Sequence, residues 1–303
     1  MNDPHTLLLP SLDGASPLGF LAALGTWRIT EQIYPGTQMH WKHHAGHWAP
    51  VLHLGNPLGE HDFVDQIYTK LKKGTTNQLF RLNKDLKIPI SSFRNEARKT
   101  IKSGNFQIAD WFSAIGSDAH EDRYGNIEGT LFDLMNAGKQ YFLQTIFFLV
   151  ENTSQDDLRN TLFEKWTYEN QRGGMRWDIA EDRRYALRWK DPQADTTESQ
   201  WGANRLAIEA LPLLQTFPSS TRLQTTGFLS KGKKQTFFTW PIWIFPISVD
   251  VCRSLLGITG NYGIDDSSDL SKMGVANLFR SQRIWKGKAP NDYSNFCPAT
   301  AVG

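Results

Sequence analysis

The N-terminal part of the chain contains the stretch Ser16-Pro17-Leu18-Gly19-Phe20-Leu21-Ala22-Ala23-Leu24-Gly25. It predicts the start of a helix, because serine is a preferred N-terminal cap and proline suits the first helical position. Apolar residues continue at Ile29 and Ile33, so we expect the helix to run on by several turns. Gly19 and Gly25 would weaken an isolated helix. We therefore expect another stretch of backbone to pack closely against both glycines.

Helices and antiparallel hairpins alternate after this helix without the regular order of a parallel sheet, which favours an α+β fold. A hairpin is expected over 39–54 around the turn Ala45-Gly46, and strands over 223–229 and 237–244 around the lysine-rich turn at 231–234. We expect an irregular tail beyond residue 284. The predicted helices cover 60–73, 92–102, 136–150, a segment opened by Ser154 with Asp157, 203–214, and 248–256 ending at Gly257.

The pair Gly173-Gly174 marks a break in the pattern and a candidate boundary between two lobes. The first lobe, 1–172, would be rich in helices and would hold the 39–54 hairpin and a basic block. The second lobe, 173–303, would mix helices and strands. A single domain with a turn at the two glycines is the alternative.

Composition narrows the class of protein. The chain has 303 residues, of which 40% are apolar and 21% charged, as is usual for a globular protein. Its two cysteines are too few for a disulfide framework, which favours a cytoplasmic location. No secretory signal is visible, and the longest apolar stretch, 141–150, is far short of a membrane span of about 20 residues. We expect no membrane insertion.

Charge is distributed unevenly along the chain. Residues 69–105 carry ten basic and two acidic side chains, whereas residues 106–170 carry four basic and eleven acidic ones. The basic block could contact a phosphate backbone, because lysine and arginine neutralise phosphates. It could equally be a solvated face, or could dock on the acidic block or on a partner protein.

No catalytic motif stands out. A Walker loop, a dinucleotide-binding fingerprint and a nucleophile elbow are all absent from the sequence. Six of the eight histidines fall between His40 and His61, but neighbouring strand residues face opposite sides, so we predict no metal site there. The segment 118–122, with Asp118 and His120, is interpreted as an exposed acidic loop. We expect a protein that is not an enzyme and uses no cofactor or metal.

Arginine and aromatic residues are interleaved between residues 176 and 189. Arg183-Arg184-Tyr185 and Arg188-Trp189 could stack on unpaired bases while holding phosphates, or could make cation–π contacts inside the fold. Asp178, Glu181 and Asp182 are interpreted as ion-pair partners of these arginines.

Four segments together resemble the small accessory proteins of type I-G CRISPR loci, formerly type I-U, in particular the Csb-type proteins and the helicase-extension family. The resemblance implies a non-catalytic subunit or accessory part of an RNA-guided antiviral complex. Its partners would be guide RNA or target DNA and other CRISPR-associated subunits, and it implies no catalytic residues. The segments are Leu12 to Gly25, Met175 to Asp178 with Glu181 to Trp189, Gly202 to Ala207, and Phe238 to Pro241.

Our hypothesis is that this chain contacts a nucleic-acid backbone through its basic block. Two alternatives stay open: a protein–protein scaffold without direct nucleic-acid binding, and a metal-dependent nuclease that uses Asp118, His120 or the hairpin histidines. The main predicted phosphate contacts are Lys72, Lys73, Arg81, Lys84, Lys87, Arg94, Arg98, Lys99 and Lys102, with Arg183, Arg184 and Trp189 as secondary candidates.

Overall fold

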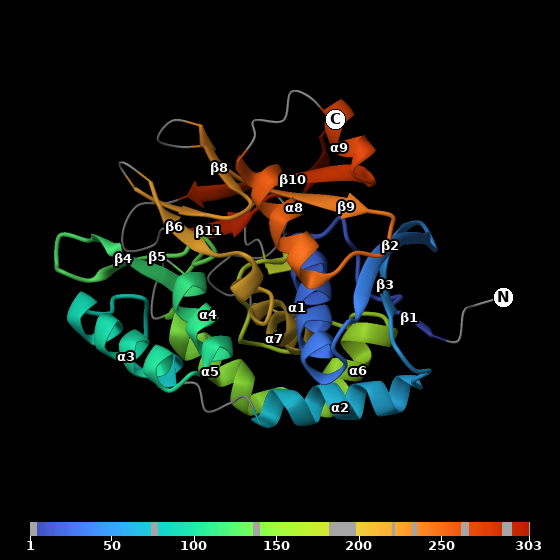
Figure 1. Cartoon of the computed structure of the whole chain (residues 1–303), viewed down its shortest axis with the longest axis horizontal. Coiled ribbons are helices and arrows are strands. Elements are labelled where there is room, and N and C mark those ends of the chain that lie inside the picture. Colours follow the sequence, from blue (N-terminus) through green and yellow to red (C-terminus); the bar gives the residue numbers. More distant parts are fainter. Residues whose placement is uncertain are drawn as a thin grey trace.

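The computed structural model describes residues 5–73, 78–135, 140–181, 198–219, 222–231, 235–261, 267–286 and 293–302. Helices and antiparallel sheets combine in an α+β fold, as the sequence predicts (Figure 1). The helices are α1 (Pro17–Ile33), α2 (Glu60–Lys73), α3 (Ile90–Lys102), α4 (Phe106–Ile115), α5 (Phe142–Asn152), α6 (Gln155–Phe163), α7 (Trp201–Ile208), α8 (Val249–Asn261) and α9 (Ser267–Lys272).

The strands form separate antiparallel sheets. One sheet has the order β1-β3-β2, a second the order β11-β10-β9-β8 with β12 paired to β10, and β4-β5 and β6-β7 form two short ribbons. The strands are β1 (Thr6–Leu8), β2 (Gln38–His44), β3 (His47–His53), β4 (Gly116–Glu121), β5 (Ile127–Gly129), β6 (Thr216–Pro218), β7 (Leu223–Thr225), β8 (Phe228–Lys231), β9 (Gln235–Trp243), β10 (Val275–Lys286), β11 (Tyr293–Phe296) and β12 (Thr300–Ala301).

Helix α1 lies at the centre of the molecule and confirms the prediction for its start. The Ser16 side chain accepts a hydrogen bond from the Gly19 backbone N–H, and Pro17 is the first helical residue. Both glycines are closely packed: a Cβ atom would lie 2.3 Å from Asp13 O at Gly19 and 1.7 Å from Leu206 O at Gly25. The absence of a side chain at Gly25 therefore sets how closely α1 and α7 approach each other.

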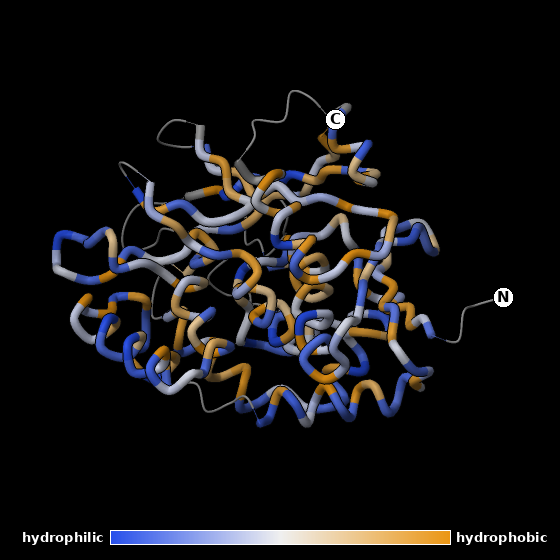
Figure 2. Tube along the Cα trace, in the orientation of Figure 1, coloured by the Kyte–Doolittle hydropathy of each residue, from blue (hydrophilic) through white to orange (hydrophobic). Residues whose placement is uncertain are grey.

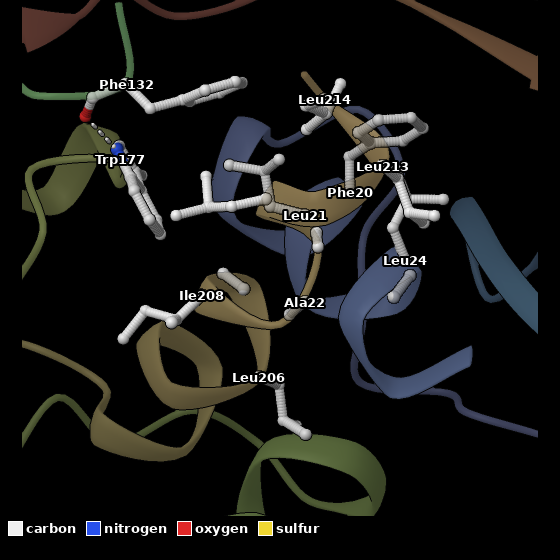
Figure 3. Packing of buried hydrophobic residues seen from close by; sticks show 14 of the residues in the cluster. Phe20, Leu21, Ala22, Leu24, Phe132, Trp177, Leu206, Ile208, Leu213 and Leu214 are labelled. Carbon is white, nitrogen blue, oxygen red and sulfur yellow. Dashed lines mark hydrogen bonds between the residues drawn. The ribbon is translucent and has the colours of Figure 1, made fainter. Parts of the chain in front are cut away.

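Apolar side chains fill the space around this helix pair. Figure 3 shows Ala22 of α1 close to α7, whose Leu206 side chain points away from α1 toward another helix. On the other side of α1, Phe20 stacks on Trp41 of β2 and lies 5.7 Å from the Trp240 ring of β9. The indole N–H of Trp240 donates to Gly14 O. The core thus joins α1 to both of the larger sheets.

The helices at the periphery are amphipathic. Helix α2 alternates between hydrophilic and hydrophobic positions along its length (Figure 2), and its buried residues include Phe63, Ile67 and Leu71. Helix α6 begins with the predicted capping box, in which Ser154 and Asp157 each bond the other's backbone N–H. Within the described residues, no helix is long and apolar enough to cross a membrane.

Several local predictions are wrong. The helix expected over 203–214 ends at Ile208, and a short 3-10 turn follows at Leu211–Leu213, because Pro212 cannot continue the hydrogen bonding of an α-helix. The strand expected over 223–229 divides at Gly227, where φ is +84°, so that β7 pairs with β6 and β8 with β9. Helix α8 runs through Gly257 to Asn261.

The C-terminal part is also more regular than expected. Residues 275–286 form β10, which pairs with β9, and the predicted irregular tail contributes β11 and β12 to the same sheet. Strand β4, which pairs with β5, occupies residues 118–121 of the segment 118–122, in which an acidic loop was expected.

Contacts connect the two sides of the pair Gly173-Gly174. Met39 of β2 exchanges backbone hydrogen bonds with Ile247, and the Trp27 ring of α1 packs 6.1 Å from the Trp243 ring of β9. Gly173 itself has a φ of +76°, which fits the predicted turn. The division into lobes at this point stays a prediction.

Candidate nucleic-acid interface

Helix α3 lies at the surface and carries the densest part of the basic block. Its buried residue Phe93 packs edge-to-face on Phe112 of α4, with ring centroids 5.2 Å apart. The exposed face then presents Arg94, Arg98 and Lys102, because residues four apart lie one above another on a helix. The three side chains form a row along the helix, which we call the α3 row.

The members of the α3 row differ in what they contact. The Arg94 Nε donates to Asp118 Oδ2 at 2.6 Å and its Nη2 donates to Asp118 O at 3.1 Å, so this arginine fastens α3 to β4. Arg98 and Lys102 are exposed, and neither has a hydrogen-bond or ion-pair partner among the described residues. Arg98 and Lys102 are therefore available to bind an external anion.

Exposed aromatic rings flank the α3 row. At the N-terminus of α3 the Ile90 N–H donates to Gly125 O, which places the turn between β4 and β5 beside the helix. In this turn Tyr124 is 71% exposed, and the Arg123 guanidinium lies 4.7 Å from its ring. At the other end Phe106, the first residue of α4, is 69% exposed. A helix of this length spans about 20 Å, so the rings bracket a short row of cations.

The remaining predicted phosphate contacts are distributed over several elements, and part of them bind the protein itself. Lys72 Nζ donates to Val150 O and Glu151 O near the C-terminus of α5, and the Arg81 guanidinium lies over the Phe147 ring. Lys99 pairs with Glu96, and Lys87 lies 3.8 Å from Asp85. Among these remaining residues, Lys73 and Lys84 are exposed, and their side chains have no hydrogen-bond or ion-pair partner among the described residues.

The basic block therefore meets the acidic block at defined points. Arg94 pairs with Asp118, and Lys72 binds two carbonyl groups of the segment 150–151, all of which belong to residues 106–170. Docking within the chain accounts for these two cations. It does not account for Arg98 or Lys102.

The secondary candidates Arg183, Arg184 and Trp189 lie outside the described residues. Immediately before them, Glu181 is buried and its Oε2 accepts a hydrogen bond from the Arg176 backbone N–H at 2.8 Å. The Arg176 guanidinium donates to Gln140 Oε1. Asp178, also buried, accepts a hydrogen bond from the Tyr168 hydroxyl. The predicted ion pairs with Arg183, Arg184 and Arg188 involve residues outside the described part of the chain and stay a prediction.

Burial changes the protonation of these two carboxyl groups. It raises the pKa of Glu181 to about 8, with a further contribution from the negative charge of Asp178. Burial also raises the pKa of Asp178. Gly174 makes room for the glutamate, since a Cβ atom there would lie 2.2 Å from Glu181 Oε2. The role of this pair is to hold the segment 174–181 in the core.

The residues named for the nuclease alternative are not brought together as a metal site. Asp118 binds Arg94, while the His120 Nε2 lies 2.9 Å from Ser219 O. On the hairpin, His40 Nδ1 lies 2.8 Å from His53 Nε2, and burial together with the neighbouring His53 lowers the pKa of His40 to about 4. In the part of the chain that the structure describes, no three His, Cys, Asp or Glu side chains form a group that could hold a metal ion.

Sequence reasoning did not identify Phe106 or Tyr124 as binding residues. Both residues follow polar or glycine-rich segments, and this context is the only signal of their exposure that the sequence offers. Exposure itself depends on the packing of α4 and of the β4–β5 turn. No family model matches the chain, and no curated protein has a matching sequence.

Proposed function

We propose that this chain binds the backbone of a single-stranded nucleic acid through the α3 row and the aromatic residues at its two ends. The observation that carries the proposal is the combination of two exposed, unpartnered cations, Arg98 and Lys102, with exposed Tyr124 and Phe106 rings. Cations neutralise phosphates, and aromatic rings accept unpaired bases by stacking.

The wider role that we propose is that of a non-catalytic, CRISPR-associated subunit in RNA-guided antiviral defence, with guide RNA or target DNA and other subunits as partners and a location in the cytoplasm. The resemblance of the segments at 12–25, 175–189, 202–207 and 238–241 supports this role. In such complexes base pairing reads the sequence, so the protein mainly contacts the backbone.

The first test changes the charge of the α3 row. Arg98→Gln with Lys102→Gln should weaken the binding of single-stranded RNA regardless of sequence and reduce the salt slope by about two, one for each lost phosphate contact. Fluorescence anisotropy over a range of salt concentrations measures both quantities. The control, Lys165→Gln with Lys272→Gln, removes the same charge from exposed positions outside α3 and should leave the slope unchanged.

The second test concerns the rings. Phe106→Ala with Tyr124→Ala should weaken binding of single-stranded RNA or DNA by about 1–3 kcal/mol per lost base stack. Binding of duplex DNA, whose bases are already stacked, should change much less. If the wild-type chain binds none of the three nucleic acids at low salt, the proposal is wrong and the scaffold alternative replaces it.

A further inference from the structure

Residues of α1, α2, α4 and α7 line an open cavity of about 300 Å³, and of its cationic side chains only Lys70 and Lys73 belong to the basic block. Two buried arginines, Arg28 of α1 and Arg205 of α7, form part of its wall. Lys70 and Lys73 of α2 reach it from a second side. Trp111 of α4 adds an aromatic wall, and the Arg28 guanidinium lies 5.6 Å from its ring.

The positive charge in this wall exceeds the negative charge. Glu209 is the one carboxylate lining the cavity within the described residues. Its Oε2 accepts from Arg28 Nη1 at 3.0 Å and its Oε1 accepts from Arg205 Nη1 at 2.8 Å, so it is shared between two guanidinium groups. Nearby Asp110 already pairs with Arg253. The buried members of the wall are Arg28, Arg205 and Glu209, which leave one positive charge uncompensated. A buried excess of positive charge is costly unless an anion compensates it.

Both arginines also retain unused donors. A guanidinium group has five N–H donors, and Glu209 occupies only the Nη1 atoms of Arg28 and Arg205. Among the described residues, no protein acceptor is present for the Nε and Nη2 donors of either side chain. None of these unpartnered Nε and Nη2 atoms is fully buried, as expected for donors that open toward the cavity.

We propose that this cavity binds a phosphoryl group. Two guanidinium forks suit a tetrahedral oxyanion, because each can donate two parallel hydrogen bonds to its oxygens. Four cationic side chains against one carboxylate favour a doubly charged phosphate monoester over a singly charged carboxylate. The side-chain amides of Gln32, Asn105 and Gln107 complete the polar wall. The site is separate from the α3 row and does not require it.

A phosphate monoester can come from a free nucleotide or from the end of a nucleic-acid strand. Thermal unfolding of the full chain with adenosine 5′-monophosphate and with adenosine tests the first source, since a ligand of the folded state raises the midpoint. Anisotropy with RNA of one sequence, bearing either a 5′-phosphate or a 5′-hydroxyl, tests the second. We expect at least one phosphorylated probe to bind about tenfold more tightly than its unphosphorylated counterpart, a difference of about 1.4 kcal/mol.

Surface variants keep the test independent of folding. Lys70→Gln with Lys73→Gln, both on α2, should remove most of the preference for the phosphorylated probe. The control pair, Lys165→Gln with Lys272→Gln, should retain it, since neither lysine lines the cavity, and α9, which carries Lys272, lies across the molecule from α2 (Figure 1). Arg98→Gln with Lys102→Gln should also retain it, which separates this site from the α3 row.

Each outcome decides the proposal. A preference for the nucleotide or for the 5′-phosphorylated strand that depends on Lys70 and Lys73 supports the site and identifies its source. Equal binding of phosphorylated and unphosphorylated probes by the wild-type chain overturns it, whatever the α3 row binds. A preference that survives Lys70→Gln with Lys73→Gln also overturns it.

Discussion

Replacing a glycine by alanine should have opposite effects on stability at two helical positions of this protein. At Gly25 a methyl group would lie 1.7 Å from Leu206 O, so Gly25→Ala must push α1 away from α7. We expect this change to lower the free energy of unfolding by about 3 kcal/mol or more. Gly257 in α8 has open space around it, so Gly257→Ala should raise stability by about 0.5–1 kcal/mol through helix propensity. Urea unfolding of both variants measures the contrast, and equal effects would contradict it.

The buried carboxyl group of Glu181 makes the free energy of unfolding depend on pH. The folded chain holds the carboxyl proton up to about pH 8, whereas the ordinary pKa is 4.5. Between these values the folded state binds more protons than the unfolded chain, so this group makes the free energy of unfolding fall as pH rises. Glu181→Gln mimics the protonated form and should remove that fall. The free energy of unfolding of the variant, relative to wild type, should therefore increase by up to about 4 kcal/mol between pH 4.5 and pH 8.

The measurement is the difference in unfolding free energy between Glu181→Gln and wild type across this pH range. Asp178 and Asp133, whose pKa values burial also raises, are present in both proteins, so their direct contributions largely cancel in the difference. The exposed residue Glu169 offers a control, because Glu169→Gln removes a nearby carboxyl group without changing the buried one. A constant difference for Glu181→Gln would show that the carboxyl group ionises normally in the folded chain.

For single residues, close packing is easier to predict from the sequence than the protonation of a buried carboxyl group. Two glycines within an apolar helix predict close backbone contacts, because glycine weakens a helix unless the missing side chain lets another segment approach. Both contacts occur. The sequence predicts ion pairs between Glu181 and the arginines near it. Its Oε2 accepts from the Arg176 backbone N–H, and Arg183, Arg184 and Arg188 lie outside the described residues, so that prediction stays a prediction. Burial decides protonation, and burial depends on residues far away in the chain.

The elements that begin with their own capping residues were the easiest to predict. Ser16 and Ser154 fix the starts of α1 and α6, and the turn Ala45-Gly46 fixes the hairpin of β2 and β3. Strands β10 and β11 contain no comparable local signal. They are stabilised by pairing with β9 and with each other, so their existence depends on the whole sheet.

The same distinction applies to the candidate interface. The basic residues of α3 are visible in the sequence, but their division into structural and available cations depends on β4. Arg94→Ala breaks the contact with Asp118 and should lower the free energy of unfolding by about 0.5–1 kcal/mol, because the pair is half-exposed. Arg98→Ala removes no contact with the described residues and should change stability by less than about 0.5 kcal/mol. Urea unfolding compares them, and a larger effect of Arg98→Ala would contradict the assignment.

The whole molecule is organised around tryptophan rings that link early and late parts of the chain. Trp41 of β2 packs edge-on against Trp243 of β9, with centroids 6.0 Å apart, and the Trp243 indole N–H donates to Met39 O. The chain has eleven tryptophans, and rings of this size usually lie in the core. The sequence does not show which rings meet, because those pairs are separated by about two hundred residues and bring long loops together.

These contacts predict how the chain unfolds. Because one set of packed side chains spans residues on both sides of Gly173, we expect a single cooperative transition in guanidinium, with the same midpoint by far-ultraviolet and near-ultraviolet circular dichroism. Trp243→Leu removes contacts to both β2 and α1, so it should lower stability by about 2–4 kcal/mol and shift both signals together. Two separate transitions, only one of them moved by Trp243→Leu, would instead establish independent lobes that meet at the glycine pair.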